Sequence, residues 1–260
     1  DNFEQIFRGD NDSNNPIFLS ELIIYDTDQT ANRVAIEANI GETYNIDLPS
    51  GVDPGFDQVD GFVETWYDQS GNGNDAVQAT ADNQPKIVSA GSLVSGGIEF
   101  DGSNDKLDAS YSSSGTTNAY LLTAVATIAN STGNQTILAT GSGPWASDDA
   151  WLFKRRSGLN NELAIETSNG GGILSPANYT SLESLVVAQG DSTDTKLFSN
   201  GSEVATGSVI TIETQNIQIA NRANASILSG KINEIIVYFT DQSANRTAIE
   251  ANINGHYSIF

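Results

Sequence analysis

Asp, Asn and Ser side chains gather in two short stretches of this sequence, residues 68–75 (DQSGNGND) and 101–108 (DGSNDKLD). Both stretches hold enough oxygen atoms to bind Ca²⁺, which takes six to eight oxygen ligands in irregular geometry. The alternative is turn chemistry, in which glycines supply positive φ angles and Asp and Asn side chains accept hydrogen bonds from backbone amides. The sequence leaves both interpretations open. The calcium ligands it offers are Asp68, Asn72, Asn74, Asp101, Asn104 and Asp105.

Aromatic side chains supply a second kind of chemistry, the stacking of sugar rings, with Asn and Asp reading the hydroxyls. Trp145 lies in a Gly-Pro-Trp-Ala-Ser-Asp segment typical of an exposed loop, so it is the main candidate. Trp151 begins an apolar run, and its alternative role is core packing. Two further residues complete the predicted carbohydrate-binding set: Tyr67, just before the first Asp/Asn-rich stretch, and Asn72, within it. Trp66 follows an apolar run and is expected in the core.

Charge and composition exclude several classes of partner. The 260 residues include 33 acidic and 11 basic side chains, for a formal net charge of −22. A chain this acidic is not expected to bind nucleic acid, which requires clustered Lys and Arg, or anionic lipid surfaces. It contains no cysteine and no long apolar run, so we expect neither disulfides nor membrane insertion. An extracellular, cell-surface or virion-surface setting suits this charge.

The elements that must position these residues are short strands separated by turn signals. Runs rich in β-branched and apolar residues recur from Phe62–Tyr67 to Ile232–Tyr238, with Gly, Asn, Asp and Ser between them. Asn200-Gly201 is the strongest of these signals and predicts a two-residue hairpin. More than ten such strands predict an all-β fold, a two-sheet antiparallel β-sandwich or jelly roll.

One stretch of the chain occurs twice. Residues 19–46 repeat residues 232–259 at an offset of 213, and 17 of the 28 aligned pairs are identical. Each copy predicts a strand, Phe18–Tyr25 in the first, then a short helix ended by Gly41 or Gly255. One strand and one helix cannot bury enough apolar surface alone. We therefore expect residues 1–46 to be the closing strand and helix of a preceding repeat, or an extension docked on this sandwich. Residues 47–60 form a linker, and the main module spans 61–260.

Four motifs occur in the order found in one family: DQSGNGNDA (68–76), IEFDGSNDKLD (98–108), KLFSNGSEVATGS (196–208) and LSGKINEIIVY (228–238). With them, residues 61–260 resemble a laminin-G-like, concanavalin A-like domain of bacterial and phage surface proteins. The resemblance implies two antiparallel sheets packed face to face, one of them concave.

The segment WYDQSGNGND (66–75) is also similar to part of the arabinofuranosidase B catalytic domain, which shares the sandwich. That similarity implies a catalytic Glu after a Gly-Pro-Trp stretch, and Glu166 is the matching position. The stretch that matches the family's acid/base region, residues 219–224, contains no carboxylate. Glycosidases use a pair of carboxyl groups, so Glu166 alone is a weak candidate.

Together these patterns predict a non-catalytic adhesion or glycan-binding module of a larger, repetitive surface protein. A structural module of a phage head, tail fibre or other appendage is one alternative, and an arabinofuranosidase-like hydrolase is another. The partners expected are a glycan or neighbouring surface or virion subunits.

Overall fold

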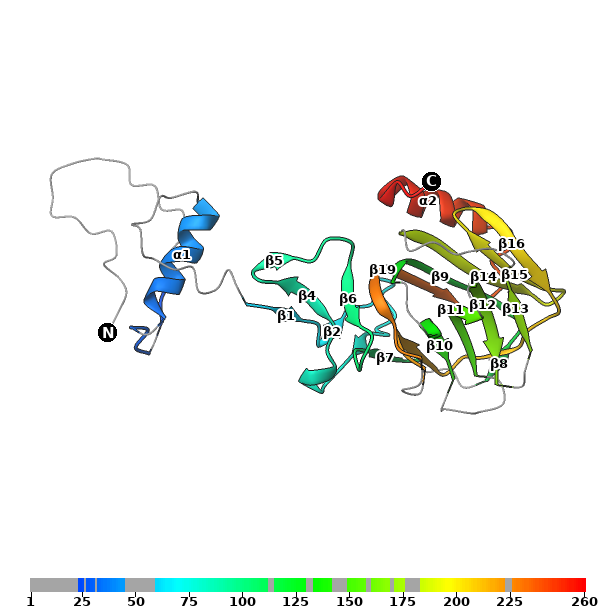
Figure 1. Cartoon of the computed structure of the whole chain (residues 1–260), viewed down its shortest axis with the longest axis horizontal. Coiled ribbons are helices and arrows are strands. Elements are labelled where there is room, and N and C mark those ends of the chain that lie inside the picture. Colours follow the sequence, from blue (N-terminus) through cyan, green and yellow to red (C-terminus); the bar gives the residue numbers. More distant parts are fainter. Residues whose placement is uncertain are drawn as a thin grey trace. The chain divides into compact units, whose positions relative to one another are not determined.

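The computed structural model describes residues 23–25, 27–30, 32–44, 59–111, 115–129, 133–141, 149–157, 160–168, 171–175, 183–222 and 226–260. The chain divides into two compact units, residues 1–56 and 57–260. Within the first unit, the described residues form one helix, α1 (Arg33–Tyr44). The second unit is a β-sandwich that ends in a helix, α2 (Arg246–Tyr257) (Figure 1).

Two antiparallel sheets form the sandwich, which confirms the predicted fold class. In the described residues the first sheet runs in the order β1-β4-β6-β19-β9-β14-β15-β16, with β5 beside β4. Its strands are β1 (Gly61–Phe62), β4 (Lys86–Ser89), β5 (Ser92–Leu93), β6 (Ile98–Asp101), β9 (Ala119–Ile128), β14 (Ser184–Asp191), β15 (Thr195–Ser199), β16 (Ser202–Gly207) and β19 (Ser229–Tyr238).

The second sheet of the described chain runs in the order β13-β12-β11-β10-β18-β7-β3-β2. Its strands are β2 (Thr65–Trp66), β3 (Ala76–Val77), β7 (Leu107–Ser110), β10 (Gln135–Thr140), β11 (Ala150–Ser157), β12 (Asn160–Thr167), β13 (Gly172–Leu174) and β18 (Asn216–Ile219). A small ribbon pairs β8 (Thr116–Thr117) with β17 (Ile212–Glu213), and a 3₁₀ turn covers Ala81–Asn83.

The core lies between the two sheets and follows from the period-2 alternation of their strands. Leu122 and Ala124 of β9 meet Leu138, Leu152 and other apolar side chains of the second sheet in one buried cluster. The intervening residues of β9 are also buried, because α2 covers the outer face of the first sheet (Figure 1). This double burial explains why the sequence of β9 reads as an almost continuous apolar run.

The turns follow the predicted chemistry. Asn200 and Gly201 both adopt positive φ angles, 49° and 76°, and connect β15 to β16 as the predicted hairpin. Residues 68–74 form no regular element, as expected for a turn-dense loop.

The structure differs from two sequence predictions about the repeated stretch, the second of which lies largely outside the described residues. Neither helix ends at its glycine: α1 continues through Gly41 to Tyr44, and α2 continues through Gly255 to Tyr257. In α2 the left-handed residue that terminates the helix is Ser258, with φ 55°, so a non-glycine residue takes the C-terminal turn. The predicted strand Phe18–Tyr25 is not formed in its described part, residues 23–25, which lack the strand partner that β19 finds in β9.

Candidate functional site

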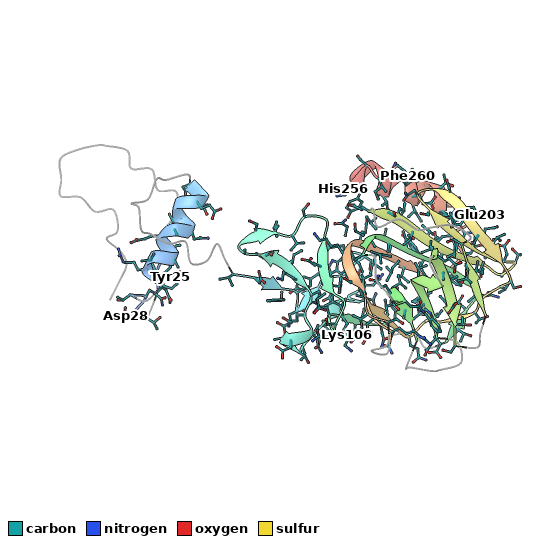
Figure 2. The ribbon with its side chains drawn as sticks, viewed as in Figure 1. Tyr25, Asp28, Lys106, Glu203, His256 and Phe260 are labelled. Atoms are coloured by element: carbon teal, nitrogen blue, oxygen red, sulfur yellow. The ribbon has the colours of Figure 1, made fainter. Side chains whose placement is uncertain are left out.

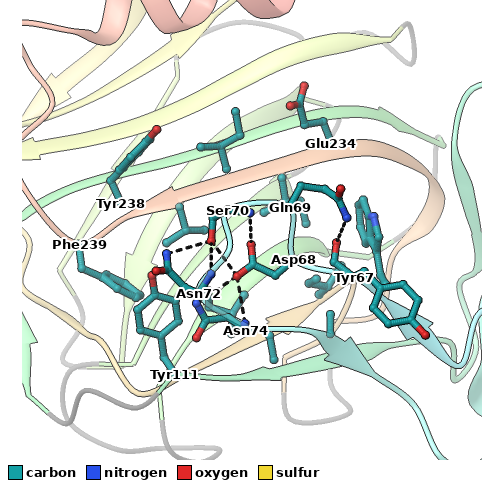
Figure 3. A pocket seen from close by; sticks show the side chains of 18 of the residues that line it. Tyr67, Asp68, Gln69, Ser70, Asn72, Asn74, Tyr111, Glu234, Tyr238 and Phe239 are labelled. Atoms are coloured by element: carbon teal, nitrogen blue, oxygen red, sulfur yellow. Dashed lines mark hydrogen bonds between the residues drawn. The ribbon is translucent and has the colours of Figure 1, made fainter.

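A cavity of about 680 Å³ opens where the loop of residues 68–74 meets β19 (Figure 3). It lies beside the part of β19 that follows the pairing of this strand with β6. From Gly230 to Ile232, β19 pairs with both β6 and β9. From Glu234 to Tyr238 the described strands include only β9 as its partner. The residues that line the cavity are Trp66–Ser70, Asn72, Asn74, Ala76, Ala109, Tyr111, Ile217, Ile219, Asn233–Thr240 and Tyr257.

Asp68 fixes the loop that forms the polar wall of this cavity (Figure 3). Its Oδ1 accepts the backbone N–H of Ser70 at 2.8 Å. Its Oδ2 accepts the hydroxyl of Ser70 at 2.8 Å and the backbone N–H of Asn74 at 3.0 Å. These bonds, led by the one from the Ser70 amide, lower the pKa of the Asp68 carboxyl to about 2. The loop therefore presents a fixed set of polar side chains beside the cavity.

Tyr67 is the most exposed of the aromatic residues that line the cavity, ahead of Tyr238, which is 39% exposed. Its side chain lines the cavity while 66% of the residue remains accessible to solvent. The Gln69 amide donates a hydrogen bond to the Tyr67 backbone carbonyl at 3.1 Å, which ties this residue to the loop. Deeper in the cavity, the rings of Tyr111 and Phe239 meet edge to face, with centroids 5.0 Å apart. The cavity thus combines a solvent-facing ring with an aromatic interior.

The wall formed by β19 carries one carboxyl group. Burial raises the pKa of Glu234 above its ordinary value, and the nearby His256 acts in the opposite direction. Burial, Glu234 and Glu183 together raise the pKa of Tyr257. His256 itself is exposed on α2 (Figure 2). Asp68 and Glu234 are thus the two carboxyl groups among the residues that line the cavity.

The first Asp/Asn-rich stretch uses its oxygen atoms for turn chemistry. Both carboxylate oxygens of Asp68 already accept N–H or O–H donors. Gly71 and Gly73 adopt φ angles of 83° and 73°, as the turn interpretation requires. Asp68, Asn72 and Asn74, the predicted calcium ligands, thus take part in the hydrogen bonds of the turn, and calcium binding by them stays a prediction.

The second stretch has the same organisation. Asp101 Oδ1 accepts the backbone N–H groups of Ser103 and Asn104, at 2.7 and 3.3 Å. The Asn104 amide nitrogen donates to the carbonyl of Asp82 at 2.6 Å. Asp105 is buried and accepts the Asp101 backbone N–H, and burial raises the pKa of its carboxyl to about 6. In the described residues, no group of three or more His, Cys, Asp or Glu side chains could hold a metal ion.

The remaining predicted residues lie away from this cavity. Trp145 lies outside the described residues. Trp151 is 7% exposed and packs with Ala139 and Ala164 on the outer face of the second sheet, opposite the core. The Arg222 guanidinium lies 3.2 Å from the centroid of its ring. Glu166 pairs across from Trp151 and interacts electrostatically with Arg222.

The structure therefore separates the residues that the sequence grouped together. Tyr67 and Asn72 line the cavity, whereas Trp151 and Glu166 belong to a different face of the sandwich. Sequence reasoning missed the contribution of residues 233–240, because their apolar pattern predicts an ordinary core strand. The signal available was the set of tyrosines Tyr111, Tyr238 and Tyr257, whose polar ends favour positions at the surface.

Comparisons with known proteins concern the fold of this chain. No profile of a known protein family matches the chain, and no curated protein matches it. Among solved structures, the chain is similar to Trypanosoma rangeli sialidase in complex with 2,3-difluoro-KDN, with a TM-score of 0.50 and 12% identity. That match covers 87% of this chain and 39% of the sialidase.

Two smaller structures are also similar. The CBM40 of Ruminococcus gnavus IT-sialidase, bound to alpha2,3 sialyllactose, matches with a TM-score of 0.42 and 18% identity, over 51% of this chain and 82% of its own. Domain 4 of AbnA, a GH43 extracellular arabinanase from Geobacillus stearothermophilus in complex with arabinotriose, matches with a TM-score of 0.45 and 14% identity, over 72% of this chain and 82% of its own.

None of the helices in the described part of the chain is long and apolar enough to cross a membrane.

Proposed function

We propose that residues 61–260 form a non-catalytic glycan-binding module, and that it binds a neutral oligosaccharide in the cavity beside β19. The observation that carries this proposal is Tyr67, a largely exposed aromatic ring on a cavity wall next to a fixed polar loop. Sugar rings stack their C–H faces on such rings while neighbouring polar groups bind the hydroxyls.

The composition of the cavity walls supports a sugar as the ligand. Gln69, Ser70 and Asn72 are exposed and line the cavity. Amide and hydroxyl side chains both donate and accept hydrogen bonds, as sugar hydroxyls do. The opposite wall includes Ile235 and Val237, whose apolar side chains suit the C–H face of a sugar ring. Because the hydrogen bonds of Asp68 hold the loop in place, little conformational entropy is lost on binding.

The negative charge of the protein favours neutral glycans over acidic ones. Asp68 stays ionised over the physiological range because its pKa is about 2. Glu234 adds a second carboxyl group, and the whole chain carries a net charge of −22. These negative charges repel sugars that carry carboxylate or sulfate groups. Neutral hexoses and pentoses are the class that this cavity favours.

The hydrogen bonds of Asp68 support binding without hydrolysis. Both of its carboxylate oxygens accept donors from Ser70 and Asn74, so this carboxylate holds the loop in place. Glu166, the position matched to a glycosidase nucleophile, is not among the residues that line the cavity. We therefore assign no catalytic role to Glu166.

An adhesive module on a cell or virion surface is the setting that fits an acidic chain with a glycan site. The alternative role, a structural module of a phage head, tail fibre or other appendage, requires contacts with copies of itself or with neighbouring subunits. It predicts no response to glycans, so the same experiment separates the two roles.

A glycan array with the full chain tests the proposal, with Tyr67→Ala as the probe variant and Tyr25→Ala as the matched control. Tyr25 is also half exposed, and it lies in the other unit (Figure 2). We expect neutral glycans to bind wild type and Tyr25→Ala alike and to lose at least tenfold in affinity with Tyr67→Ala. Absence of any glycan signal from wild type, together with self-association, would support the assembly role instead.

A further inference from the structure

The helix α2 shows what the repeated stretch does in the sandwich. It lies on the outer face of the first sheet, where Ile253 is 2% exposed (Figure 1). Ile249, Tyr257 and Ile259 pack around it, together with Ile236 from β19. The sheet contributes a patch of five apolar side chains, which we call the helix-binding face: Leu121, Val125, Leu185, Val187 and Phe198. The strand and the helix of the repeat thus close one face of the sandwich together.

An ion pair completes this contact. Arg246 pairs with Glu250 one turn later, and the two side chains are only 18% and 4% exposed. The Arg246 guanidinium lies 3.8 Å from the centroid of the Phe198 ring. A paired arginine over an aromatic ring is both charge-balanced and stacked. The pair is therefore part of the interface with the helix-binding face.

The first copy of the repeat carries the same contact residues. Arg33, Ile36, Glu37, Ile40 and Tyr44 of α1 occupy the positions of Arg246, Ile249, Glu250, Ile253 and Tyr257. Ile23 and Ile46 occupy those of Ile236 and Ile259. The four differences within the 12-residue helix fall at positions outside this set. Arg33 and Glu37 form the equivalent ion pair at 3.0 Å.

In the first unit, four of these residues are more exposed than their counterparts. The Arg33 and Glu37 side chains are 67% and 41% exposed, against 18% and 4% for Arg246 and Glu250. Ile23 and Tyr44 are each 40% exposed. A helix of 12 residues gains most of its stability from packing its apolar face. Its contact residues therefore point to a partner surface.

We propose that residues 19–46 are the closing strand and helix of another β-sandwich of this kind, and that α1 binds a helix-binding face on that sandwich. The partner presents apolar residues at the positions of Leu121, Val125, Leu185, Val187 and Phe198, with an aromatic ring beneath Arg33. The helix-binding face of the same chain is already covered by α2. This proposal is independent of glycan binding.

The strand of the first copy fits the same role. In β19, Ile232, Ile235 and Val237 face the core between the sheets. The corresponding residues are Leu19, Leu22 and Ile24, all apolar. Residues 19–25 can therefore follow a Ser-Gly-Lys segment like 229–231 as a closing strand that pairs with an equivalent of β9. Successive modules would then each be completed by the same kind of strand and helix.

A fusion protein tests the proposal directly. The fusion consists of residues 61–231 followed directly by residues 19–260. Its first segment, 61–231, lacks its own closing strand and helix, so residues 19–46 are placed where 232–259 would normally follow. In a reference fusion, residues 232–259 replace 19–46 at the junction. We expect both fusions to contain two folded sandwiches, with an unfolding enthalpy about twice that of the single chain.

Matched variants show which helix each unfolding transition of the fusion depends on. We expect Ile36→Asp with Ile40→Asp to unfold only the upstream sandwich, halving the enthalpy and exposing residues 61–231 to protease. Ile249→Asp with Ile253→Asp removes the downstream transition instead. The proposal is overturned if the reference fusion gives two folded sandwiches and the 19–46 fusion gives one. It is equally overturned if Ile36→Asp with Ile40→Asp leaves the upstream transition unchanged.

Discussion

Asp68 accepts the backbone N–H of Asn74 at 3.0 Å, across five intervening residues that include two left-handed glycines. This bond and those from Ser70 close the polar wall of the cavity around one carboxylate. The loop is therefore a preformed feature, and its stability depends on the charge of Asp68.

Replacing Asp68 tests this dependence through pH. The folded-state pKa of about 2 lies below the ordinary value of 3.8, so ionised Asp68 stabilises the fold at neutral pH. This contribution is present above about pH 4 and is lost as the pH falls toward 2. We expect Asp68→Asn to lower the unfolding free energy by on the order of 1 kcal/mol at pH 7. In urea titrations the difference from wild type should close near pH 2, and a difference independent of pH would contradict the assignment.

For Asp105 the expected change of stability with pH has the opposite sign. Its folded-state pKa of about 6 lies above the ordinary value of 3.8, so the buried carboxyl favours its protonated form. Stability from this group is present below about pH 4 and is lost as the pH rises through 6. We expect Asp105→Asn to gain stability relative to wild type between pH 4 and pH 7. Thermal melts at both values provide the check, and an equal difference at both would show that Asp105 titrates normally.

The two repeated helices predict unequal effects of the same substitution. Ile253→Ala removes a buried side chain from the helix-binding face and should destabilise the sandwich by about 2–5 kcal/mol. Ile40→Ala, its counterpart in α1, should leave the sandwich transition unchanged, because α1 belongs to the other unit. Chemical denaturation followed by near-ultraviolet circular dichroism compares the two. Equal losses from both variants would show that α1 supports the sandwich in the same chain.

Trp151 and Arg222 lie on the outer face of the second sheet, which we do not expect to bind glycans. The guanidinium covers the indole at 3.2 Å, so Arg222→Ala should expose Trp151 and shift its fluorescence to longer wavelength. Subtracting the spectrum of Trp151→Phe isolates this signal from the other tryptophans. We expect glycan affinity to change less than twofold. If Arg222→Ala abolished binding that Tyr67→Ala preserved, the site would lie on the second sheet.

Calcium remains a prediction that the hydrogen bonds of both Asp/Asn-rich stretches disfavour. Their carboxylates already accept backbone amides, so we expect the midpoint of thermal unfolding to be the same in millimolar Ca²⁺ and in a chelator. Mg²⁺ serves as the control for nonspecific screening of the acidic surface. A rise of several degrees with Ca²⁺ alone would restore the calcium interpretation.

The sequence predicted the fold because its signals are local. Strand runs and turn residues depend on neighbours in the chain, and Asn200-Gly201 forms the hairpin that its residue types require. The cavity could be predicted only in part. Tyr67 and Asn72 carry polar and aromatic chemistry that can be recognised in the sequence, whereas the opposite wall comes from residues 233–240. Those residues line a cavity because β6 departs from β19 after Ile232, a tertiary feature without a local signal.

The placement of Trp151 was open for a similar reason. Its position at the start of a strand allows either face of the sheet, and one residue of register decides between them. The structure places it opposite the core, beneath Arg222, whose position 71 residues later no local pattern connects to it.

Calorimetric titration of the full chain with the best neutral glycan from the array tests the central claim most directly. Wild type and Tyr25→Ala should bind with one site per chain and equal affinity. Tyr67→Ala should lose at least tenfold in affinity while keeping the thermal stability of wild type, because Tyr67 is exposed. Undiminished binding by a folded Tyr67→Ala protein would contradict the assignment of the cavity beside β19 as the glycan site.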